Sequence, residues 1–303
     1  MTASKFIVVV SGLGNGTGTG ASVARLFAKQ LGYRIALLSR PRKEVDELKN
    51  EIKNAGGEAE VFNVDKYTHA TLKTTFEKIK QTWPDGRLKA AVWNTAQWSN
   101  IPFLDIKEQD IELSAQLNII AATAFAQEAV RAFTASGNGD DVGGTLIMTG
   151  ATSAWRGKEG FGAFAAGKHG LRALSQSIAR EYGPQGVHVA FVVIDGVILT
   201  TRTAAMFANH PVKGSSWLHD EKQRLSVRMR VLRAVAAARL LPLCPATVNP
   251  PDSIARTYLF LHQQTPDAWT LEMDLRRVSL ILKYPLSSLT RCSRLLRPAK
   301  EKF

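Results

Sequence analysis

The chain has 303 residues, of which 45% are apolar and 21% charged, a composition typical of a globular protein with a large buried core. Its 39 Lys and Arg exceed its 26 Asp and Glu, giving a formal charge of +13. The excess lies in residues 222–248 and 276–303, and the rest is neutral. The charge therefore does not indicate a nucleic-acid partner or a membrane surface for the main body of the chain.

Other protein classes are excluded by simple sequence features. No apolar run reaches the roughly 18 residues of a membrane-spanning helix, and residues 1–5 lead into a strand-like run instead of a signal peptide. Two cysteines, Cys244 and Cys292, are too few for a disulfide framework or for a metal site with the usual ligand count. We expect a cytoplasmic protein without a transmembrane segment and without a bound metal.

Short apolar runs alternate with helical patterns from the first residues onward. Most runs are apolar almost throughout, as in strands buried on both faces of a parallel sheet, and the intervening segments have a spacing of 3.6 residues. This alternation predicts an α/β fold, a Rossmann-type doubly wound parallel sheet of about seven strands in a single domain. The predicted strands are residues 6–11, 34–39, 59–64, 90–94, 145–149, 187–194 and 269–273.

A glycine-rich turn follows the first predicted strand and opens the first predicted helix. It contains Gly12, Gly16 and Gly18. Glycine allows close approach of the backbone to a pyrophosphate, and the free N–H groups at a helix start favour an anion. The pattern predicts a dinucleotide site; the alternative is a structural turn without a ligand.

With this spacing the chain begins to resemble the short-chain dehydrogenase/reductase family, and the resemblance continues over roughly residues 5–275. Asn94-Thr-Ala is similar to the family's Asn-Asn-Ala-Gly motif, and Asp195-Gly-Val-Ile-Leu-Thr200 occupies the place of Pro-Gly-x-Val-x-Thr. Asp65 matches the residue that contacts adenine. The resemblance implies cofactor contacts from Gly12, Gly16, Thr17, Gly18, Ser39, Arg40, Asp65, Asn94, Lys168, Ile198 and Thr200.

The end of the second strand favours one cofactor. An acid there binds the ribose 2′-hydroxyl of NAD, whereas Arg accommodates the 2′-phosphate of NADP. The chain has Ser39-Arg40, then Arg42 and Lys43, and no acid before Glu44. NADP(H) is therefore predicted over NAD; the alternative for Arg40 is an ordinary charge at the start of a solvated helix.

The family's catalytic residues are only partly present. The resemblance implies a tyrosine, a lysine four residues later and a serine about 13 residues earlier; here these positions hold Phe164, Lys168 and Ala151. Thr152 and Ser153 are adjacent hydroxyl candidates, and Asn118 matches the asparagine of a water-linked proton relay.

Two interpretations stay open. In one, Lys168 binds the nicotinamide ribose, while Thr152 or Ser153, or a water held by Asn118 and Lys168, supplies the proton. In the other, only nucleotide binding remains. His169 lies about 100° off the Lys168 face of the helix, and Tyr182 is expected to pack near the helix end.

Phe in the tyrosine position together with Asp-Gly for Pro-Gly resembles an atypical subgroup of the family, which implies that the substitution is a subgroup feature. Trp98, Trp155 and Phe161 follow strand ends, where open α/β sheets bind ligands. They indicate an apolar substrate or are ordinary packing residues. The predicted function is an NADP(H)-dependent oxidoreductase for a carbonyl or alcohol; the alternative is a nucleotide-binding regulatory or scaffold protein.

Quaternary structure and the basic stretches rest on the same resemblance. It implies a homodimer or homotetramer through helices near 107–134 and 161–182. Residues 222–248 are expected to be a substrate lid, a basic insertion on a membrane or partner, or translated non-coding sequence. Residues 277–303 form a basic tail after a domain of residues 1–276, and removal of 277–297 would restore the subgroup's Asp-Leu-Arg-Pro ending. Nucleic-acid binding is not expected.

Overall fold

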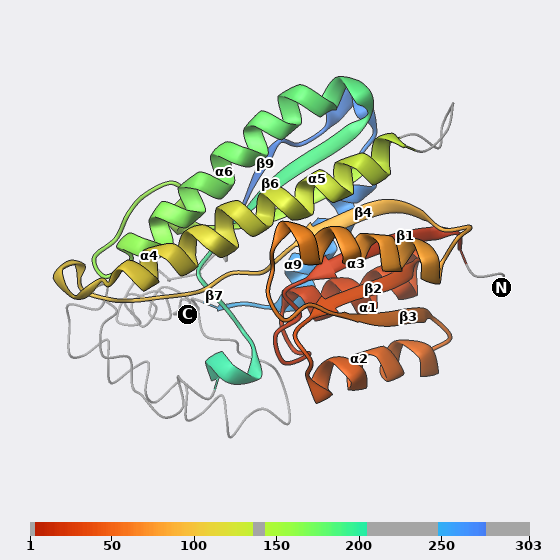
Figure 1. Cartoon of the computed structure of the whole chain (residues 1–303), viewed down its shortest axis with the longest axis horizontal. Helices are drawn as coiled ribbons and strands as arrows, with labels where there is room; N and C mark the ends of the chain where they lie inside the picture. Colours follow the sequence, from red (N-terminus) through yellow and green to blue (C-terminus); the bar gives the residue numbers. More distant parts are fainter. Residues whose placement is uncertain (1–3, 136–142, 205–247, 277–303) are drawn as a thin grey trace, which may run out of the picture.

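The computed structural model describes residues 4–135, 143–204 and 248–276 (Figure 1). One sheet has the strand order β3-β2-β1-β4-β5-β6-β9, and every pairing in it is parallel. The order reverses between β1 and β4, which confirms the predicted doubly wound α/β fold. Its strands are β1 (Phe6–Ser11), β2 (Arg34–Ser39), β3 (Glu58–Asn63), β4 (Arg87–Trp93), β5 (Gly144–Ala151), β6 (Val187–Asp195) and β9 (Glu272–Arg276).

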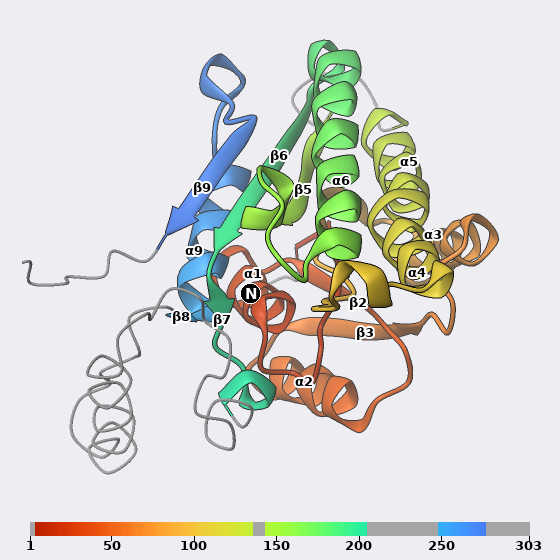
Figure 2. The same cartoon turned by 90° about the vertical axis from the view of Figure 1, so that its left-hand side faces the viewer.

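Helices cover both faces of the sheet (Figure 2). One face packs against α1 (Thr19–Leu31), α2 (Lys43–Asn54) and α9 (Pro251–His262). The other packs against α3 (His69–Thr82), α5 (Ala121–Thr134) and α6 (Gly162–Tyr182). Because neighbouring residues of a strand point to opposite faces, Val8 and Val10 join the first core, whereas Ile7 and Val9 join the second. Two buried faces explain why the inner strands are apolar almost throughout.

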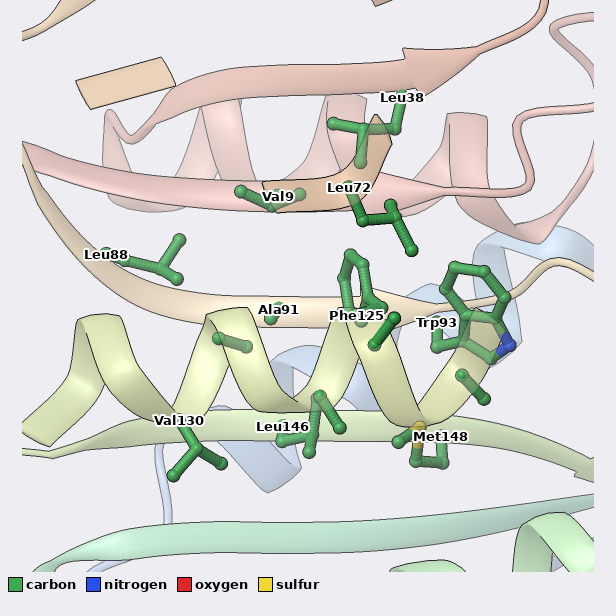
Figure 3. Packing of buried hydrophobic residues seen from close by; sticks show 14 of the residues in the cluster. Val9, Leu38, Leu72, Leu88, Ala91, Trp93, Phe125, Val130, Leu146 and Met148 are labelled. Carbon is green, nitrogen blue, oxygen red and sulfur yellow. The ribbon is translucent and has the colours of Figure 1, made fainter. Parts of the chain in front are cut away.

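The core on the α5 side is filled by aromatic and aliphatic side chains. Phe125 of α5 and Trp93 of β4 lie over the strands, between Leu72 of α3 and Met148 of β5 (Figure 3). Phe125 and Trp93 are fully buried, with ring centroids 5.1 Å apart. This packing fixes the ends of β4 and β5, which carry the candidate site.

The last strand lies three residues later than predicted. Trp269 is not in the strand; it stacks on His188, with ring centroids 5.1 Å apart. The strand instead pairs with β6 from Phe191↔Glu272 to Asp195↔Arg276. Its alternating charged side chains suit a sheet edge, and they are the reason that an apolar-run criterion placed the strand too early.

Helix α4 (Glu108–Ala115) continues through a π-helical turn, η2 (Gln116–Ile120), into α5. The turn contains Asn118, and such turns are frequent at functional sites. A short parallel pair, β7 (Val197–Ile198) and β8 (Val248–Asn249), follows β6.

Both basic stretches and both cysteines were singled out from the sequence. Apart from Val248 and Arg276, residues 222–248 and 276–303 lie outside the described residues, as do Cys244 and Cys292. In the part of the chain that the structure describes, no helix combines the length and apolarity needed to cross a bilayer.

Candidate functional site

The glycine turn is held against the end of β4. Gly12 has φ +75°, and a Cβ placed there would lie 2.4 Å from the backbone carbon of Asn94. The Asn94 side chain donates from Nδ2 to the Gly12 carbonyl oxygen at 2.7 Å. The turn therefore requires glycine at this position, and Asn94 braces it from the neighbouring strand.

Helix α1 begins without a cap or an acid. Gly18 is its N-cap residue, no side chain caps the helix, and the first turn contains no Asp or Glu. The N–H groups and the positive end of the helix dipole are thus available to an anion. A pyrophosphate fits this arrangement.

The segment after β6 returns to the glycine turn. A Cβ at Gly18 would lie 3.6 Å from Thr200 Cγ2, and the Thr201 backbone N–H donates to Thr17 Oγ1 at 3.3 Å. The Asn15 side chain also bonds Thr201. Ile198, which packs on the α1-side core, leads into this contact. Thr200 and Thr201 therefore lie against the glycine turn that contains Thr17, and Asn15 and Thr201 were not identified from the sequence.

Basic side chains follow β2. Ser39 is buried and its hydroxyl donates to the Arg40 carbonyl at 2.8 Å, whereas Arg40, Arg42 and Lys43 are exposed. Asp65, also exposed, follows β3, and the neighbouring Val64 N–H donates to the Ser39 carbonyl at 2.9 Å. The ends of both strands thus present polar groups on one side of the turn.

Lys168 is buried, with 3% of its surface exposed. Its Nζ donates to the Thr149 carbonyl at 2.8 Å and lies 5.9 Å from the centre of the Phe164 ring. Burial penalises the charged amine and lowers the pKa of Lys168 to about 7. Lys168 is therefore not an ordinary solvated helix lysine. His169, in contrast, is exposed and bonds the Ala165 carbonyl.

Asn118 lies in the contact between η2 and α6. Its side chain is fully buried; Nδ2 donates to the Ser114 carbonyl at 3.0 Å, and Oδ1 has no hydrogen-bond partner. A Cβ at Gly167 would lie 2.8 Å from Asn118 Nδ2, so glycine permits this close approach. A buried acceptor without a partner is a position where water binds.

Thr152 contacts a carboxylate that the sequence analysis gave no role. Its hydroxyl donates to Asp195 Oδ1 at 2.5 Å, and Asp195 Oδ2 lies 3.5 Å from Arg276 Nε. Ala151 ends β5, and Thr152 and Ser153 follow in a short 3₁₀ turn. Asp195 and Arg276 were missed; the available signal was the acid in place of proline at the end of β6.

The aromatic candidates separate into two groups. Trp98 and Phe161 have ring centroids 5.8 Å apart, and Phe161 continues the contact to Phe164 at 6.4 Å. Trp98 is 51% exposed. Trp155 lies elsewhere, with Nε1 donating to Glu272 at 2.7 Å and the Arg276 guanidinium 5.5 Å from its ring. Trp98, Phe161 and Phe164 thus form one partly exposed apolar wall.

Comparison with known proteins identifies the family. Residues 6–210 match the sequence profile of the family described as short chain dehydrogenase. The chain belongs to the short-chain dehydrogenase/reductase family. Members of this family are NAD(P)-dependent oxidoreductases.

Relatives within the family are distant. A 3-oxoacyl-[acyl-carrier-protein] reductase of Mus musculus is 26% identical over 199 residues, covering 65% of this chain and 78% of its own. The short-chain dehydrogenase/reductase eriH of Hericium erinaceus is 26% identical over 230 residues, covering 74% and 84%.

Solved structures share the fold. A short-chain dehydrogenase from Rhodopseudomonas palustris has a TM-score of 0.66 at 25% identity, covering 90% of this chain and 99% of its own. L-Sorbose reductase from Gluconobacter frateurii, solved with NADPH and L-sorbose, has a TM-score of 0.69 at 20% identity, covering 89% and 95%. These structures support the fold of the chain.

In the described ranges, no three or more His, Cys, Asp or Glu side chains lie grouped so that they could hold a metal ion.

Proposed function

We propose that this short-chain dehydrogenase/reductase is an NADP(H)-dependent oxidoreductase that interconverts an alcohol and a carbonyl compound. The observation that carries the proposal is the start of α1, which follows the Gly12–Gly18 turn directly and has no capping side chain. The buried Lys168 adds to it. When bound, the nicotinamide supplies or accepts the hydride. The residues of the chain bind the cofactor and manage the proton.

The preference for NADP(H) rests on charge. Arg40, Arg42 and Lys43 are exposed at the end of β2, and no carboxylate precedes Glu44. An additional 2′-phosphate is attracted by these cations, whereas the 2′-hydroxyl of NAD would lack its acidic partner.

The proton has to come from groups other than the usual phenol, because Phe164 cannot titrate. Lys168 has a pKa of about 7 and so exchanges a proton readily near neutral pH. The free Oδ1 of Asn118 supports a water-linked relay. Between the two hydroxyl candidates, Thr152 is favoured over Ser153 because Thr152 has a carboxylate partner.

The substrate class follows from the aromatic wall. Trp98, Phe161 and Phe164 form a partly exposed apolar surface that includes the position of the usual catalytic tyrosine. An apolar alcohol or ketone would bury this surface and gain roughly 25 cal/mol per Å² of buried apolar area. Phe164, Ala151 and Asp195-Gly196 together support assignment to the atypical subgroup.

The second candidate function is a nucleotide-binding regulatory or scaffold protein without turnover. Phe164 and Ala151 favour it, because both groups that usually hold the substrate oxygen are absent. The buried Lys168 and the intact turn are compatible with either function.

The proposal also includes a homodimer or homotetramer, one nucleotide-binding domain over residues 1–276 and a cytoplasmic location. The α4–η2 surface supports self-association, since Ile111, Leu113, Ile119 and Ile120 are all exposed there.

The test is an NADPH fluorescence titration of the full chain, followed by assays with apolar ketones and, with NADP⁺, secondary alcohols. Binding with turnover that Lys168→Met abolishes supports the oxidoreductase. Binding without turnover supports the scaffold instead. Absence of NADPH binding overturns both functions.

A further inference from the structure

The carboxylate of Asp195 occupies the end of β6 and accepts a hydrogen bond from Thr152. A carboxylate has no proton to donate, so the 2.5 Å contact fixes the direction of the bond: the Thr152 hydroxyl proton points to Asp195 Oδ1. The lone pairs of Thr152 Oγ1 remain free. In this arrangement Thr152 accepts a proton from a third group and passes its own to Asp195.

The Asp195 side chain faces Arg276, and its backbone is held by Asn249. Arg276 of β9 lies 3.5 Å from Oδ2 and also pairs with Asp274. The Asn249 side chain of β8 donates to the Asp195 carbonyl oxygen at 3.0 Å. Gly196 continues the chain at φ +122°, where a side chain would be strained.

The surroundings of Arg276 also contain charged side chains. Trp155 lies under the Arg276 guanidinium and donates to Glu272, which pairs with Arg172 of α6 at 2.6 Å. The Asp195 side chain nevertheless keeps 20% of its surface exposed. A proton that reaches it can therefore leave to solvent.

The pair lies between the other parts of the candidate site. Thr152 follows β5 three residues after Thr149, whose carbonyl accepts from Lys168. Asp195 precedes the segment that reaches the glycine turn through Thr200 and Thr201. Both residues thus stand at strand ends that connect the buried amine with the nucleotide turn.

We propose that Thr152 and Asp195 form the proton relay that replaces the missing phenol, with Asp195 as the positioning residue and terminal proton acceptor. The inference rests on the proposed oxidoreductase function. In alcohol oxidation, the substrate O–H proton moves to Thr152 Oγ1 and the Thr152 proton moves to Asp195 Oδ1. The C–H bond gives its electron pair, as hydride, to NADP⁺, and the substrate oxygen becomes a carbonyl. Reduction reverses each transfer.

The test uses the full chain and the alcohol that the wild type oxidises fastest. Thr152→Val, Asp195→Asn and the double variant are compared for kcat, NADP⁺ affinity and melting temperature. Each single variant is expected to lower kcat on the order of 10²–10⁴-fold, the usual contribution of a positioned proton acceptor. The double variant is expected to be no slower than the slower single variant, because residues that act as a unit are not additive.

Two further variants separate a relay from a structural role. Thr152→Ser keeps the hydroxyl and is expected to retain kcat within about tenfold of the wild type. Asp267→Asn is the matched control, because Asp267 accepts from the Thr265 hydroxyl in an exposed 3₁₀ turn remote from the glycine turn. It is expected to leave kcat unchanged. Thr152→Val keeps the Asp195–Arg276 pair and tests the relay independently of any effect of Asp195→Asn on folding.

The failures are distinguishable. Wild-type turnover with unchanged kcat in Asp195→Asn, or strictly multiplicative losses in the double variant, overturns the relay and leaves the oxidoreductase standing. Absence of wild-type turnover overturns the oxidoreductase and the relay together.

Discussion

Lys168 lies in a buried environment that disfavours the charged form of its amine. Its amine is buried and bonds a backbone carbonyl, and burial lowers its pKa to about 7 from the ordinary 10.5. Between these two values the unfolded chain carries a proton that the folded chain lacks. The free energy of unfolding therefore decreases as pH falls from about 10.5 to about 7. Below pH 7 this residue causes no further change.

Lys168→Met is expected to stabilise the protein at pH 7 by a few kcal/mol, on the scale of about 1.4 kcal/mol for each pKa unit, while abolishing turnover. The gain is expected to shrink as pH rises toward 10. Urea unfolding of wild type and variant at pH 7 and 9.5 measures it. A variant that is less stable than the wild type at pH 7 would contradict the assignment of strain to the buried amine.

Under the proposed preference for NADP(H), Arg40 is the residue that would contact the 2′-phosphate. Arg40→Asp is expected to weaken NADPH binding roughly 10- to 100-fold, the size of one or two charge-assisted hydrogen bonds, and to improve NADH binding. Fluorescence titration with both cofactors measures the change. Arg256→Asp, the same charge change on the exposed face of α9, serves as control. Equal effects of the two variants would show that net charge alone, not a 2′-phosphate contact, sets the preference.

Among the elements, the β1–turn–α1 unit was the most predictable from the sequence. An apolar strand, closely spaced glycines and an amphipathic helix each have a local signature, and the structure confirms all three. The last strand was not predictable to the residue, because an edge strand with alternating charges lacks the apolar run that marks the inner strands.

Two glycines of the turn allow the effect of backbone strain to be measured apart from the effect of steric contact. Gly12 and Gly14 both have positive φ, but a Cβ at Gly12 would lie 2.4 Å from the Asn94 backbone, whereas Gly14 has nothing within 4 Å. Gly14→Ala is expected to lower the free energy of unfolding by about 1 kcal/mol, and Gly12→Ala by several times that amount. Thermal unfolding of both variants without cofactor measures the difference. Similar melting temperatures would contradict the close approach of β4 to the turn.

At the scale of the whole molecule, the exposed apolar residues of α4 and η2 form the proposed self-association surface. Ile111 and Ile120 are 44% and 46% exposed, and covering them in an interface would remove this apolar surface from water. Ile111→Lys with Ile120→Lys is expected to shift the protein from dimer to monomer in sedimentation experiments. Phe260→Lys, which replaces a 54% exposed apolar residue of α9, is expected to leave the mass unchanged. A wild type that sediments as a monomer would refute the proposed interface.

By itself the sequence determined what depends on neighbouring residues: the buried parallel strands, the glycine turn and the basic end of β2. Local periodicity and residue type are sufficient for these features. The tertiary structure alone decided which distant groups meet. Thr152 follows β5, Asp195 ends β6 and Arg276 ends β9, and these strands are adjacent only in the folded sheet. The burial of Lys168, and with it the low pKa, likewise arises from packing between α6 and β5, which no local pattern encodes.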